Sequence, residues 1–352
     1  MNLYVVSSAF QLLGVIDDAS SVIWTSRYQA AGDFEIYLGY TTQHLELLQP
    51  GHIVLRDDWK RFGLIQTVTM SNDPEIGNYI TVTGKDGAGI LGRRIIWEQT
   101  VVSGTVEDCM RTLVTQNIIS PSKTTRKIDG FGLAARVGYT DKMTKQMTGD
   151  NLLEALSEIC AAYGYGFAVE LDSDYHFRFR VYKGVDRSER QSTLPHVVFS
   201  PAYDNVATSE YAWDDTNYAN VALVAGEGEG TARRRTAVGD TAGISRVEIY
   251  VDARNISSND GEITDEEYMA QLYQQGVSVL GDRATIESYA GEVITGNTYQ
   301  YGQDYYLGDI VTVITEFGAK ITARITEIIE SEDETGVKTI PTFSYALEEV
   351  ED

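Results

Sequence analysis

Apolar and polar residues alternate over short stretches along much of the chain, and turn-forming residues separate these stretches. In residues 2–97, runs such as FEIYLGY and RFGLIQTVTM are rich in aromatic and β-branched residues and are bounded by Gly, Pro, Asn or Asp. Between two such runs, at 71–78, Pro74 restricts φ and Gly77 tolerates a positive φ. The pattern predicts an all-β first domain over residues 1–97 with a hairpin turn at 71–78.

Residues 98–200 contain two stretches with the three- and four-residue spacing of amphipathic helices. One apolar stripe covers 106–114 and a second covers 151–163, with Asp150 as the expected N-cap of the second helix. Alternating, strand-like residues follow the second stripe. We therefore expect a small, peripheral α+β domain over 98–200.

The last part of the chain returns to strand-like alternation, which one helix interrupts. Thr264 and Glu267 have the spacing of a capping box, and apolar residues follow at helical spacing. This predicts a second β domain over 201–352 with an inserted helix around 264–282. The predicted fold class is therefore mainly β with a minor α component.

The two β-rich ends share a sequence pattern of turns and strands. Gly51 aligns with Gly308 at an offset of 308 − 51 = 257, and Asp73 aligns with Asp333 at an offset of 333 − 73 = 260. Further aligned pairs are Ile65 with Ile325, Val68 with Ile328, Ser71 with Ser331, Gly77 with Gly336 and Ile80 with Ile340. The pattern favours a duplicated β module, with a chance likeness between strand–turn–strand units as the alternative. Structural roles in turns and in the repeat are expected for Gly32, Asp33, Gly51, Asp73, Gly77, Gly308, Asp309, Asp333 and Gly336.

The stretch VALVAGEGEGTARRRTAV, residues 221–238, allows two interpretations: a phosphate-binding loop or the tip of a β-hairpin. A dinucleotide loop needs its glycines between a strand and a helix. Here glutamates separate the glycines and would repel phosphate, and the residues that follow are strand-like. The hairpin is therefore favoured, with its glutamates and arginines pairing across the two strands. An acidic limb beside a basic one also suits a docking edge for a neighbouring subunit. The subunit-interface candidates are Glu227, Glu229, Arg233, Arg234 and Arg235.

The charge balance and the side-chain inventory argue against several functions. The chain has 352 residues with 28 Lys and Arg against 52 Asp and Glu, a net charge of −24, so a grip on nucleic acid is not expected. Cys109 and Cys160 lie on the apolar helical stripes and suit neither a disulfide framework nor a zinc site. The four histidines have no metal-binding spacing, and no nucleophile elbow or P-loop motif occurs. We expect no catalytic, cofactor or metal site and no membrane span; close pairs of acids are too common here to indicate a glycosidase.

Several unusual strings together resemble the tail-hub, or tail-tip, proteins of long-tailed phages, chiefly those of Gram-positive hosts. These strings are SRYQAAGDFEIYL (26–38), VALVAGEGEGTARRRTAVGD (221–240), SRVEIYVDARNI (245–256), YQYGQDYYLGDIVTV (299–313) and IPTFSY (340–345). The resemblance implies a baseplate-hub-like fold with two tube-like β-barrel modules and peripheral domains. It also implies that three subunits close a ring in which six barrels imitate the sixfold tail tube.

The resemblance further implies a structural protein of the virion tail tip, assembled in the host cytoplasm. Its partners would be the distal tail protein ring, the tape-measure protein and receptor-binding or tip fibre proteins, and genomic DNA would pass without specific binding. Because the sequence ends at Asp352, soon after the second β module, a lytic role is expected to belong to another protein. The alternatives are the hub of a contractile prophage-derived particle and a tail-borne protein that binds or hydrolyses cell-wall carbohydrate. A host nucleotide enzyme is disfavoured with the phosphate-loop interpretation.

Overall fold

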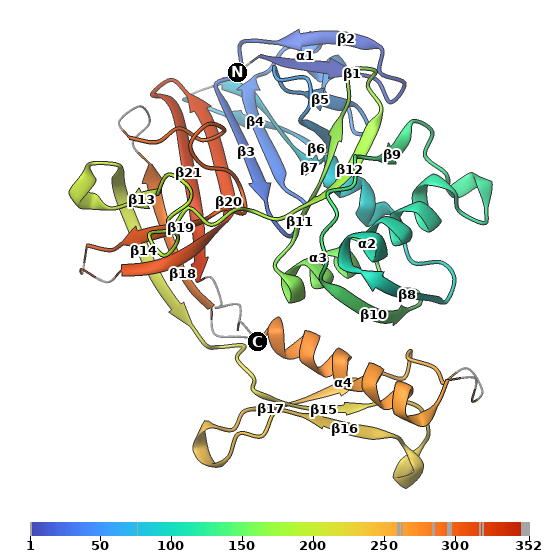
Figure 1. Ribbon diagram of the computed structural model, residues 1–352. Coiled ribbons are helices and arrows are strands. Elements are labelled where there is room, and N and C mark those ends of the chain that lie inside the picture. Colours follow the sequence, from blue (N-terminus) through green and yellow to red (C-terminus); the bar gives the residue numbers. More distant parts are fainter. Residues whose placement is uncertain are drawn as a thin grey trace.

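A continuous sheet of 13 strands joins the two ends of the sequence (Figure 1). The structure, a computed structural model, describes residues 2–75, 77–258, 261, 263–283, 286–293, 298–316, 318 and 320–345, without the side chains of 207–211, 286–293 and 345. The main path of the sheet is β14-β18-β21-β20-β3-β4-β7-β6-β5-β1-β2, and β19 joins it at β20 with β13 beside β19. Its strands are β1 (Leu3–Val6), β2 (Leu12–Ile16), β3 (Ser21–Arg27), β4 (Asp33–Gly39), β5 (Ile53–Leu55), β6 (Phe62–Asp73), β7 (Gly77–Asp86), β13 (Val198–Phe199), β14 (Val206–Asp214), β18 (Ile286–Val293), β19 (Ile310–Ile314), β20 (Lys320–Asp333) and β21 (Gly336–Tyr345).

The strands near the N-terminus bury one face and expose the other. In β4, Phe34, Ile36 and Leu38 are buried, whereas Glu35 between them is exposed. Trp24 of β3 stacks on Phe34, with 5.2 Å between the ring centroids. This alternation is typical of an antiparallel sheet with one dry face, and it is the pattern from which the strands were predicted.

The sequence repeat is also a repeat of strand pairing. The strands β5, β6 and β7 pair in the same antiparallel order as β19, β20 and β21. The Gly51 amide donates to the Ile65 carbonyl over 2.9 Å, and the Gly308 amide donates to the Ile325 carbonyl over 2.8 Å. A β-bulge follows each isoleucine, before Thr67 in β6 and before Glu327 in β20. These two groups of strands are equivalent in backbone geometry.

One pair of the predicted alignment is out of register by one residue. Ile80 lies opposite Met70, whereas Ile340 lies opposite Ile329. Because the β6–β7 turn is one residue longer than the β20–β21 turn, the counterpart of Ile80 is Thr339. The sequence alignment paired Ile80 with Ile340 because the residues are identical, and so it gave this pair an offset of 260 where the structure has 259.

The two groups of strands are joined edge to edge instead of closing into two barrels. The strand β3 pairs antiparallel with β20, from Arg27 opposite Glu327 to Ser21 opposite Asp333. Among the described residues the main path ends at β14 and at β2, and no pairing closes it. The fold is mainly β with a minor α component, as predicted, but the two expected barrels are not found as closed barrels. Residues 327–333 of β20, which follow its bulge, pair with β3, and this pairing makes the two groups of strands one sheet.

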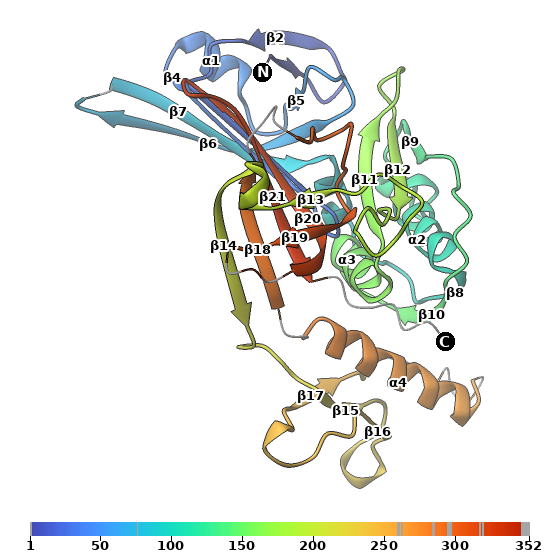
Figure 2. The same cartoon turned by 60° about the vertical axis from the view of Figure 1, so that its left-hand side comes forward.

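An α+β layer packs beside the first strands (Figure 2). It contains β8 (Thr100–Thr105) paired with β10 (Lys142–Met147), the sheet β11-β12-β9 (Gly166–Leu171, Phe177–Tyr182, Phe131–Leu133), and helices α2 (Val106–Val114) and α3 (Leu152–Tyr163). Its apolar side chains share one cluster with Ile53 and Phe62 of the large sheet. Cys109 and Cys160 are buried in that cluster as free thiols, and burial raises the pKa of the Cys160 thiol. The buried residues from Val102 to Val181 therefore share a core with the first strands, whereas Val197 and Phe199 pack with the second strands.

The second predicted helix has a different N-cap from the expected one. The Asn151 side chain accepts hydrogen bonds from the amides of Leu153 and Glu154 at 3.0 and 3.4 Å. Asp150 instead accepts from the Thr148 amide over 2.9 Å. Both residue types can cap a helix, so the sequence pattern placed the cap only to within one residue.

A separate small layer lies between β14 and β18 in the sequence. It consists of the sheet β16-β15-β17 (Arg235–Val238, Val221–Ala225, Glu248–Asp252) covered by α4 (Asp265–Gly281). Thr264 and Glu267 form the predicted capping box. Gly276 lets α4 approach the sheet, because a Cβ there would lie 2.5 Å from Val238. A short helix in the first part, α1 (Thr42–Leu47), was not predicted. Among the described residues, no helix has the length and apolar character needed to cross a bilayer.

Candidate functional site: the strand seam and the inserted hairpin

An ion-pair cluster lies where β3 meets β20. The Arg27 guanidinium donates to Asp33 and to Glu327, each over 2.7 Å. Lys85 of β7 adds a contact to Asp33 at 3.3 Å. Burial of the Asp33 carboxyl opposes its ionisation, but Arg27 and Lys85 outweigh this effect and lower its pKa. The predicted structural residue Asp33 of β4 therefore links β3 to β7. Arg27 extends the cluster to Glu327 across the β3–β20 pairing, which is called the seam below.

A more deeply buried pair crosses the same seam. The Arg56 guanidinium binds both carboxylate oxygens of Glu330, at 2.8 and 3.0 Å, and only 5% of the Arg56 side chain is exposed. Arg61 also binds Glu330, and Arg56 lies over the Trp24 ring at 5.6 Å from its centroid. Burial disfavours the Glu330 carboxylate, but the two arginines lower its pKa below the ordinary value. A bidentate guanidinium–carboxylate pair is sensitive to geometry, so this contact fixes how the two groups of strands meet.

Tyr28, in the turn after β3, lies at the junction of three parts of the chain. It is fully buried, and its hydroxyl donates to the Gly164 carbonyl over 2.9 Å. A Cβ on Gly166 would lie 2.2 Å from its ring, and a Cβ on Gly308 would lie 2.3 Å from it. These glycines leave space for the ring between the α+β layer and the second strands. The SRYQAAGD string thus serves as a structural junction.

Asp309 holds the segment after β12 (Phe177–Tyr182) to the second strands. It is 2% exposed and accepts hydrogen bonds from the Val185 amide and the Arg187 guanidinium at 2.9 and 2.8 Å. It also accepts from the Tyr306 amide over 3.0 Å. Sequence reasoning assigned Asp309 to a turn, and the structure adds this longer-range connection.

The remaining predicted turn residues have clear local roles. Asp73 and Asp333 each accept a hydrogen bond from the amide two residues later, over 2.7 Å in both turns. Gly77 and Gly336 follow with φ of 86° and 120°. Gly32 is required for a different reason, since a Cβ there would lie 2.0 Å from the Thr25 carbonyl oxygen.

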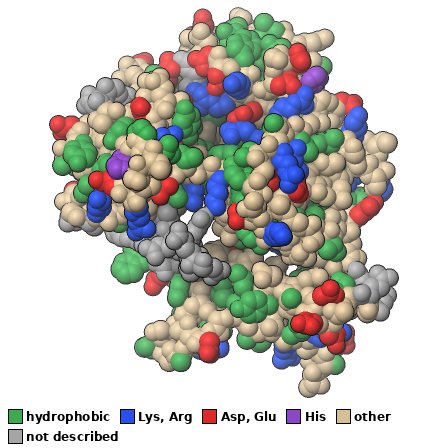
Figure 3. All heavy atoms as spheres, viewed as in Figure 1, with side chains coloured by type: hydrophobic (Ala, Val, Ile, Leu, Met, Phe, Trp, Pro, Cys, Tyr) green, Lys and Arg blue, Asp and Glu red, His purple; other side chains and the backbone are tan. Residues whose placement is uncertain are grey.

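A cavity of about 350 Å³ lies beside the seam and is lined by several cationic side chains. Figure 3 shows Lys and Arg side chains gathered near the middle of this face. The cations of the cavity are Arg27, Arg61, Arg180, Lys183 and Arg187. Each of them forms an ion pair within the chain, for example Arg180 with Glu170 at 2.8 Å and Arg187 with Asp309. The cavity therefore offers a compensated set of charges instead of a cluster of unpaired cations.

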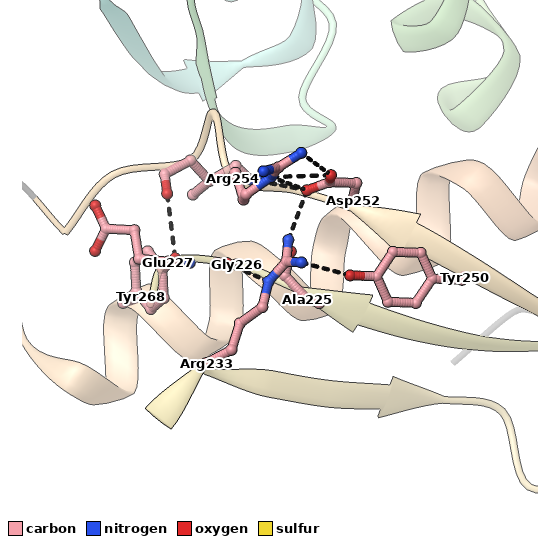
Figure 4. A network of polar contacts seen from close by, with 9 residues as sticks. Ala225, Gly226, Glu227, Arg233, Tyr250, Asp252, Arg254 and Tyr268 are labelled. Carbon is pink, nitrogen blue, oxygen red and sulfur yellow. Dashed lines mark hydrogen bonds and ion pairs between the residues drawn. The ribbon is translucent and has the colours of Figure 1, made fainter. Parts of the chain in front are cut away.

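Residues 221–238 form a β-hairpin, as predicted, and the Arg234 amide donates to the Glu227 carbonyl across it, but the ion pairs of Arg233 and Arg234 are with Asp252 and Asp265. Arg233 donates to Asp252 and to the Tyr250 hydroxyl, both over 2.6 Å, and to the carbonyls of Ala225 and Gly226, both over 2.9 Å (Figure 4). Arg254 binds Asp252 from the other side, and the hydrogen bonds from these two arginines lower the Asp252 pKa to about 2. The third strand β17 supplies the nearest acid, so Arg233 binds there.

The other four interface candidates differ in how exposed they are. Glu227 accepts hydrogen bonds from the Ser258 amide and hydroxyl at 3.0 and 2.7 Å. Arg234 pairs with Asp265 at 3.2 Å. Glu229 and Arg235 are exposed near the hairpin tip, and Arg235 donates to the Gly230 carbonyl. Glu229 and Arg235 are the two candidates whose side chains are most open to another molecule.

An acidic turn at 172–176 is the one group of potential metal ligands found in the described residues. Asp172, Asp174 and His176 hold ligand atoms within 4.8 Å of one another. Asp172 accepts hydrogen bonds from the amides of Asp174 and His176 and pairs with Arg178 at 2.7 Å. These contacts account for the cluster as a turn before β12.

Sequence reasoning missed Tyr28, Arg56 and Glu330 as residues of the seam. One signal was available: Glu330 follows the buried Ile328 by two residues and so lies on the dry face of the strand, where a charged residue needs a partner. Nothing local to Arg56 or Tyr28 identifies their partners, since these contacts join residues more than a hundred positions apart.

The chain matches the model of the Siphovirus ReqiPepy6 Gp37-like protein family over residues 2–343. The chain belongs to this family. A search of the curated proteins gave no match. The solved structures with similar folds include three phage or prophage tail proteins. The tail protein from Neisseria meningitidis MC58 is 15% identical, with 97% of this chain and 95% of that chain covered and a TM-score of 0.56. The 43 kDa tail protein of prophage MuSo2 from Shewanella oneidensis is 15% identical, with 97% of this chain and 98% of that chain covered and a TM-score of 0.57. The prophage tail protein gp18 from Listeria monocytogenes EGD-e is 12% identical, with 98% of this chain and 94% of that chain covered and a TM-score of 0.52.

The family and the fold agree with the resemblance noted in the sequence. At these identities the solved structures show a shared fold, which is that of phage tail proteins. The family is one of siphovirus proteins, and the fold is one that this chain shares with phage tail proteins. The Arg27 and Tyr28 contacts lie inside the matched region and organise this tail-protein fold.

Proposed function

We propose that the protein is a trimeric hub at the tip of the phage tail. It would join the sixfold tail tube and the distal tail ring to the tip or fibre proteins, and it would surround the channel through which DNA leaves. The proposal assigns no catalysis to this chain. Membership of a siphovirus family and the tail-protein fold support it.

The observation that carries the proposal is the repeat of strand pairing within one chain. The strands β5–β6–β7 and β19–β20–β21 have the same order and the same bulge, and the Gly51 and Gly308 amides make equivalent hydrogen bonds. Three copies of a chain with two equivalent strand groups present six equivalent groups, which matches a sixfold tube. Closed cyclic assembly also removes exposed strand edges.

The polar face of the sheet is the natural candidate for the channel wall. The strand register places on this face the carboxylates Asp33, Glu35, Asp73, Glu327 and Asp333 and the cations Arg27, Lys85 and Lys338. Carboxylates outnumber cations, and two of these cations are already paired with Asp33. A wall of this kind repels phosphate and would let DNA slide without binding.

The test of the proposal is the oligomeric state together with the position of the protein in tails. Native mass spectrometry of the purified chain should give three subunits, and electron microscopy of tails should show a threefold ring at the tip. If the purified chain is a monomer, the ring is sought in assembled tails. A protein located along the tube, or a tip without threefold symmetry, contradicts the proposal.

Incubation with host cell wall separates the hub from a carbohydrate-active tail protein. A hub without such activity should neither release sugar or peptide fragments nor pellet with the wall. Reproducible cleavage or saturable binding would favour the alternative. The contraction state of the purified particles distinguishes a siphophage tail from a contractile one.

A further inference from the structure

The internal repeat extends beyond the three strands described above. Phe34 of β4 lies opposite Gly84 of β7, and Tyr289 of β18 lies opposite Phe343 of β21. Gly84 and Phe343 are equivalent positions, because they lie opposite Ile65 and Ile325. Phe34 also lies opposite Trp24 of β3, and Tyr289 lies opposite Tyr211 of β14. The strand β14 is therefore the counterpart of β3. Each half of the chain contributes the same four adjacent strands, in the orders β3-β4-β7-β6 and β14-β18-β21-β20.

The two halves differ in what their outer edges contact. The edge of β3 pairs with residues 327–333 of β20, beyond its bulge. The counterpart of that segment is residues 67–73 of β6. In the part of the chain that the structure describes, residues 67–73 pair only with β7, and β14 pairs only with β18. The β3–β20 pairing is thus formed inside the chain. The equivalent pairing, of β14 with residues 67–73 of β6, is not formed among the described residues, and both of these strand edges are open.

These two open edges cannot meet within one chain. Six strands lie between β14 and β6 on the path β14-β18-β21-β20-β3-β4-β7-β6. At a spacing of about 4.8 Å per strand the edges are roughly 34 Å apart along the sheet. In a ring of chains, however, the β14 edge of one copy can meet the β6 edge of the next copy.

We propose that β14 of one copy pairs antiparallel with residues 67–73 of β6 in the next copy, in the register of the β3–β20 seam. This register places Asp214 opposite Thr67 and Ala212 opposite Thr69. The inference rests on the proposed ring and identifies the strands that close it. The partner is a second copy of this chain because the edge it must match is already present, in the same geometry, inside the chain.

Exposed apolar side chains on the two edges fit this pairing. Trp213 is 76% exposed and Met70 is 58% exposed. The register places Trp213 opposite Val68 and two positions from Met70, on the same face of the sheet. Cross-strand and diagonal neighbours at these positions are within contact distance of a large ring. Pairing would cover both side chains, which are costly to leave in water.

The seam between copies would differ chemically from the seam within the chain. Inside the chain, Arg27 lies opposite Glu327 and forms an ion pair with it. At the equivalent place between copies, Asp214 faces Thr67, so no such pair forms. The contact between copies would therefore depend more on apolar burial, and it should weaken little when salt concentration rises.

Disulfide trapping tests the pairing directly. The double variant Ala212→Cys with Thr69→Cys should form covalent dimers and trimers on mild oxidation, seen on non-reducing gels. Each single variant should not. The double variant Thr25→Cys with Ile329→Cys has the same geometry inside the chain and should form an intramolecular disulfide without covalent oligomers. If the purified chain is monomeric, the trapping is done in assembled tails.

Two further pairs control for register and for disulfide geometry. The pair Ala212→Cys with Val68→Cys places one thiol on the wrong face of the sheet and should not cross-link. The pair Asp214→Cys with Thr67→Cys is a second in-register position. A thermal unfolding transition like that of the unchanged protein shows that each variant is folded.

The outcomes separate this inference from the proposed function. A trimer in which neither in-register pair cross-links overturns the strand pairing and leaves the hub intact. A cross-link from position 69 to a different tail protein also overturns it. Absence of a threefold ring both in solution and in tails overturns the hub itself.

Discussion

Ile65 and Ile325 make the same two backbone hydrogen bonds in two different parts of the chain. Ile65 donates to the His52 carbonyl over 3.0 Å and accepts from the Gly51 amide, while Ile325 donates to the Asp309 carbonyl over 2.9 Å and accepts from the Gly308 amide. The chain thus contains pairs of positions with the same backbone and different surroundings. Substitutions at such pairs separate the cost of a backbone conformation from the cost of a contact.

Replacement of the two turn glycines by alanine should have unequal effects. Gly51 and Gly308 have φ of 92° and 95°, so each alanine pays about 1–2 kcal/mol for a left-handed conformation. At Gly51 the new Cβ meets open space, but at Gly308 it lies 2.3 Å from the Tyr28 ring. Gly308→Ala should therefore lower the free energy of unfolding by about 1–3 kcal/mol more than Gly51→Ala, in line with the cost of overpacking. Urea unfolding measures both, and equal losses would show that Tyr28 is not fixed at this junction.

Removal of the Glu330 charge should destabilise the seam strongly. Glu330→Gln leaves the buried Arg56 guanidinium without its carboxylate, which typically costs about 3–5 kcal/mol. The exposed Arg246–Glu248 pair is the control, and Glu248→Gln should change the free energy of unfolding by at most about 0.5 kcal/mol. Similar effects of the two substitutions, measured by urea unfolding, would contradict the buried role of Glu330.

Asp86 should contribute to the pH dependence of stability. Removal from water raises its pKa to about 6, although the amides of Gly32, Ala88 and Gly89 donate to it. Because the folded-state pKa lies above the ordinary value of 3.8, its stabilising contribution is complete only below about pH 4. It is lost as the pH rises through 6. The variant Asp86→Asn keeps an acceptor for the Ala88 amide and does not titrate.

The free energy of unfolding of Asp86→Asn relative to the unchanged protein should rise by about 1 kcal/mol between pH 5 and pH 7.5. Urea unfolding at the two pH values measures this difference. A difference that stays constant, or falls, with pH would show that the Asp86 pKa is not raised in the folded chain.

The hairpin arginines should separate into a structural residue and an interface candidate. Arg233→Ala removes hydrogen bonds to Asp252, Tyr250 and two carbonyls, so it should increase amide hydrogen exchange in β15–β17. Arg235→Ala removes a single exposed hydrogen bond and should leave exchange unchanged. Trimer or tail assembly is then measured for both. Normal assembly of Arg235→Ala, alone and with Glu229→Ala, would exclude the hairpin tip as a subunit contact.

Charge reversal on the polar face of the sheet should slow DNA release. Glu35 is exposed between buried neighbours in β4, and a lysine there would attract phosphate in the proposed channel. Phage carrying Glu35→Lys should assemble normally and eject DNA more slowly at low salt, as followed by a DNA-binding dye. The control is Glu248→Lys in the inserted layer. Equal ejection rates for the two variants would place Glu35 outside the channel.

The sequence predicted local features well because local features have local causes. The alternation that buries Phe34 and Ile36 identified β4, and the capping box at Thr264 and Glu267 identified the start of α4. The repeat was found because turn residues such as Gly51 and Gly308 are needed for a positive φ, which limits the choice of residue.

The rest depended on contacts between distant segments. The hairpin at 221–238 was predicted, but the partner of Arg233 is Asp252 on a third strand whose position the pattern did not give. The joining of the strand groups through β3 and β20 was not foreseen, since an open edge and a paired edge have the same alternation. The register of the strands could not be predicted fully either. Ile80 and Ile340 align by identity, but the turns before them differ in length by one residue.

Only one of the two equivalent hairpins carries the small layer formed by β15–β17 and α4. The β3–β4 connection is a short turn around Tyr28, whereas the β14–β18 connection contains that whole layer. In a closed assembly of three chains, bare and decorated hairpins would therefore alternate around the circumference. One rim of a pseudo-hexagonal object would then display three identical protrusions. In the proposed hub, this single insertion would turn the sixfold repeat of the tail tube into a threefold set of protrusions, which matches a tip that carries three copies of a fibre protein.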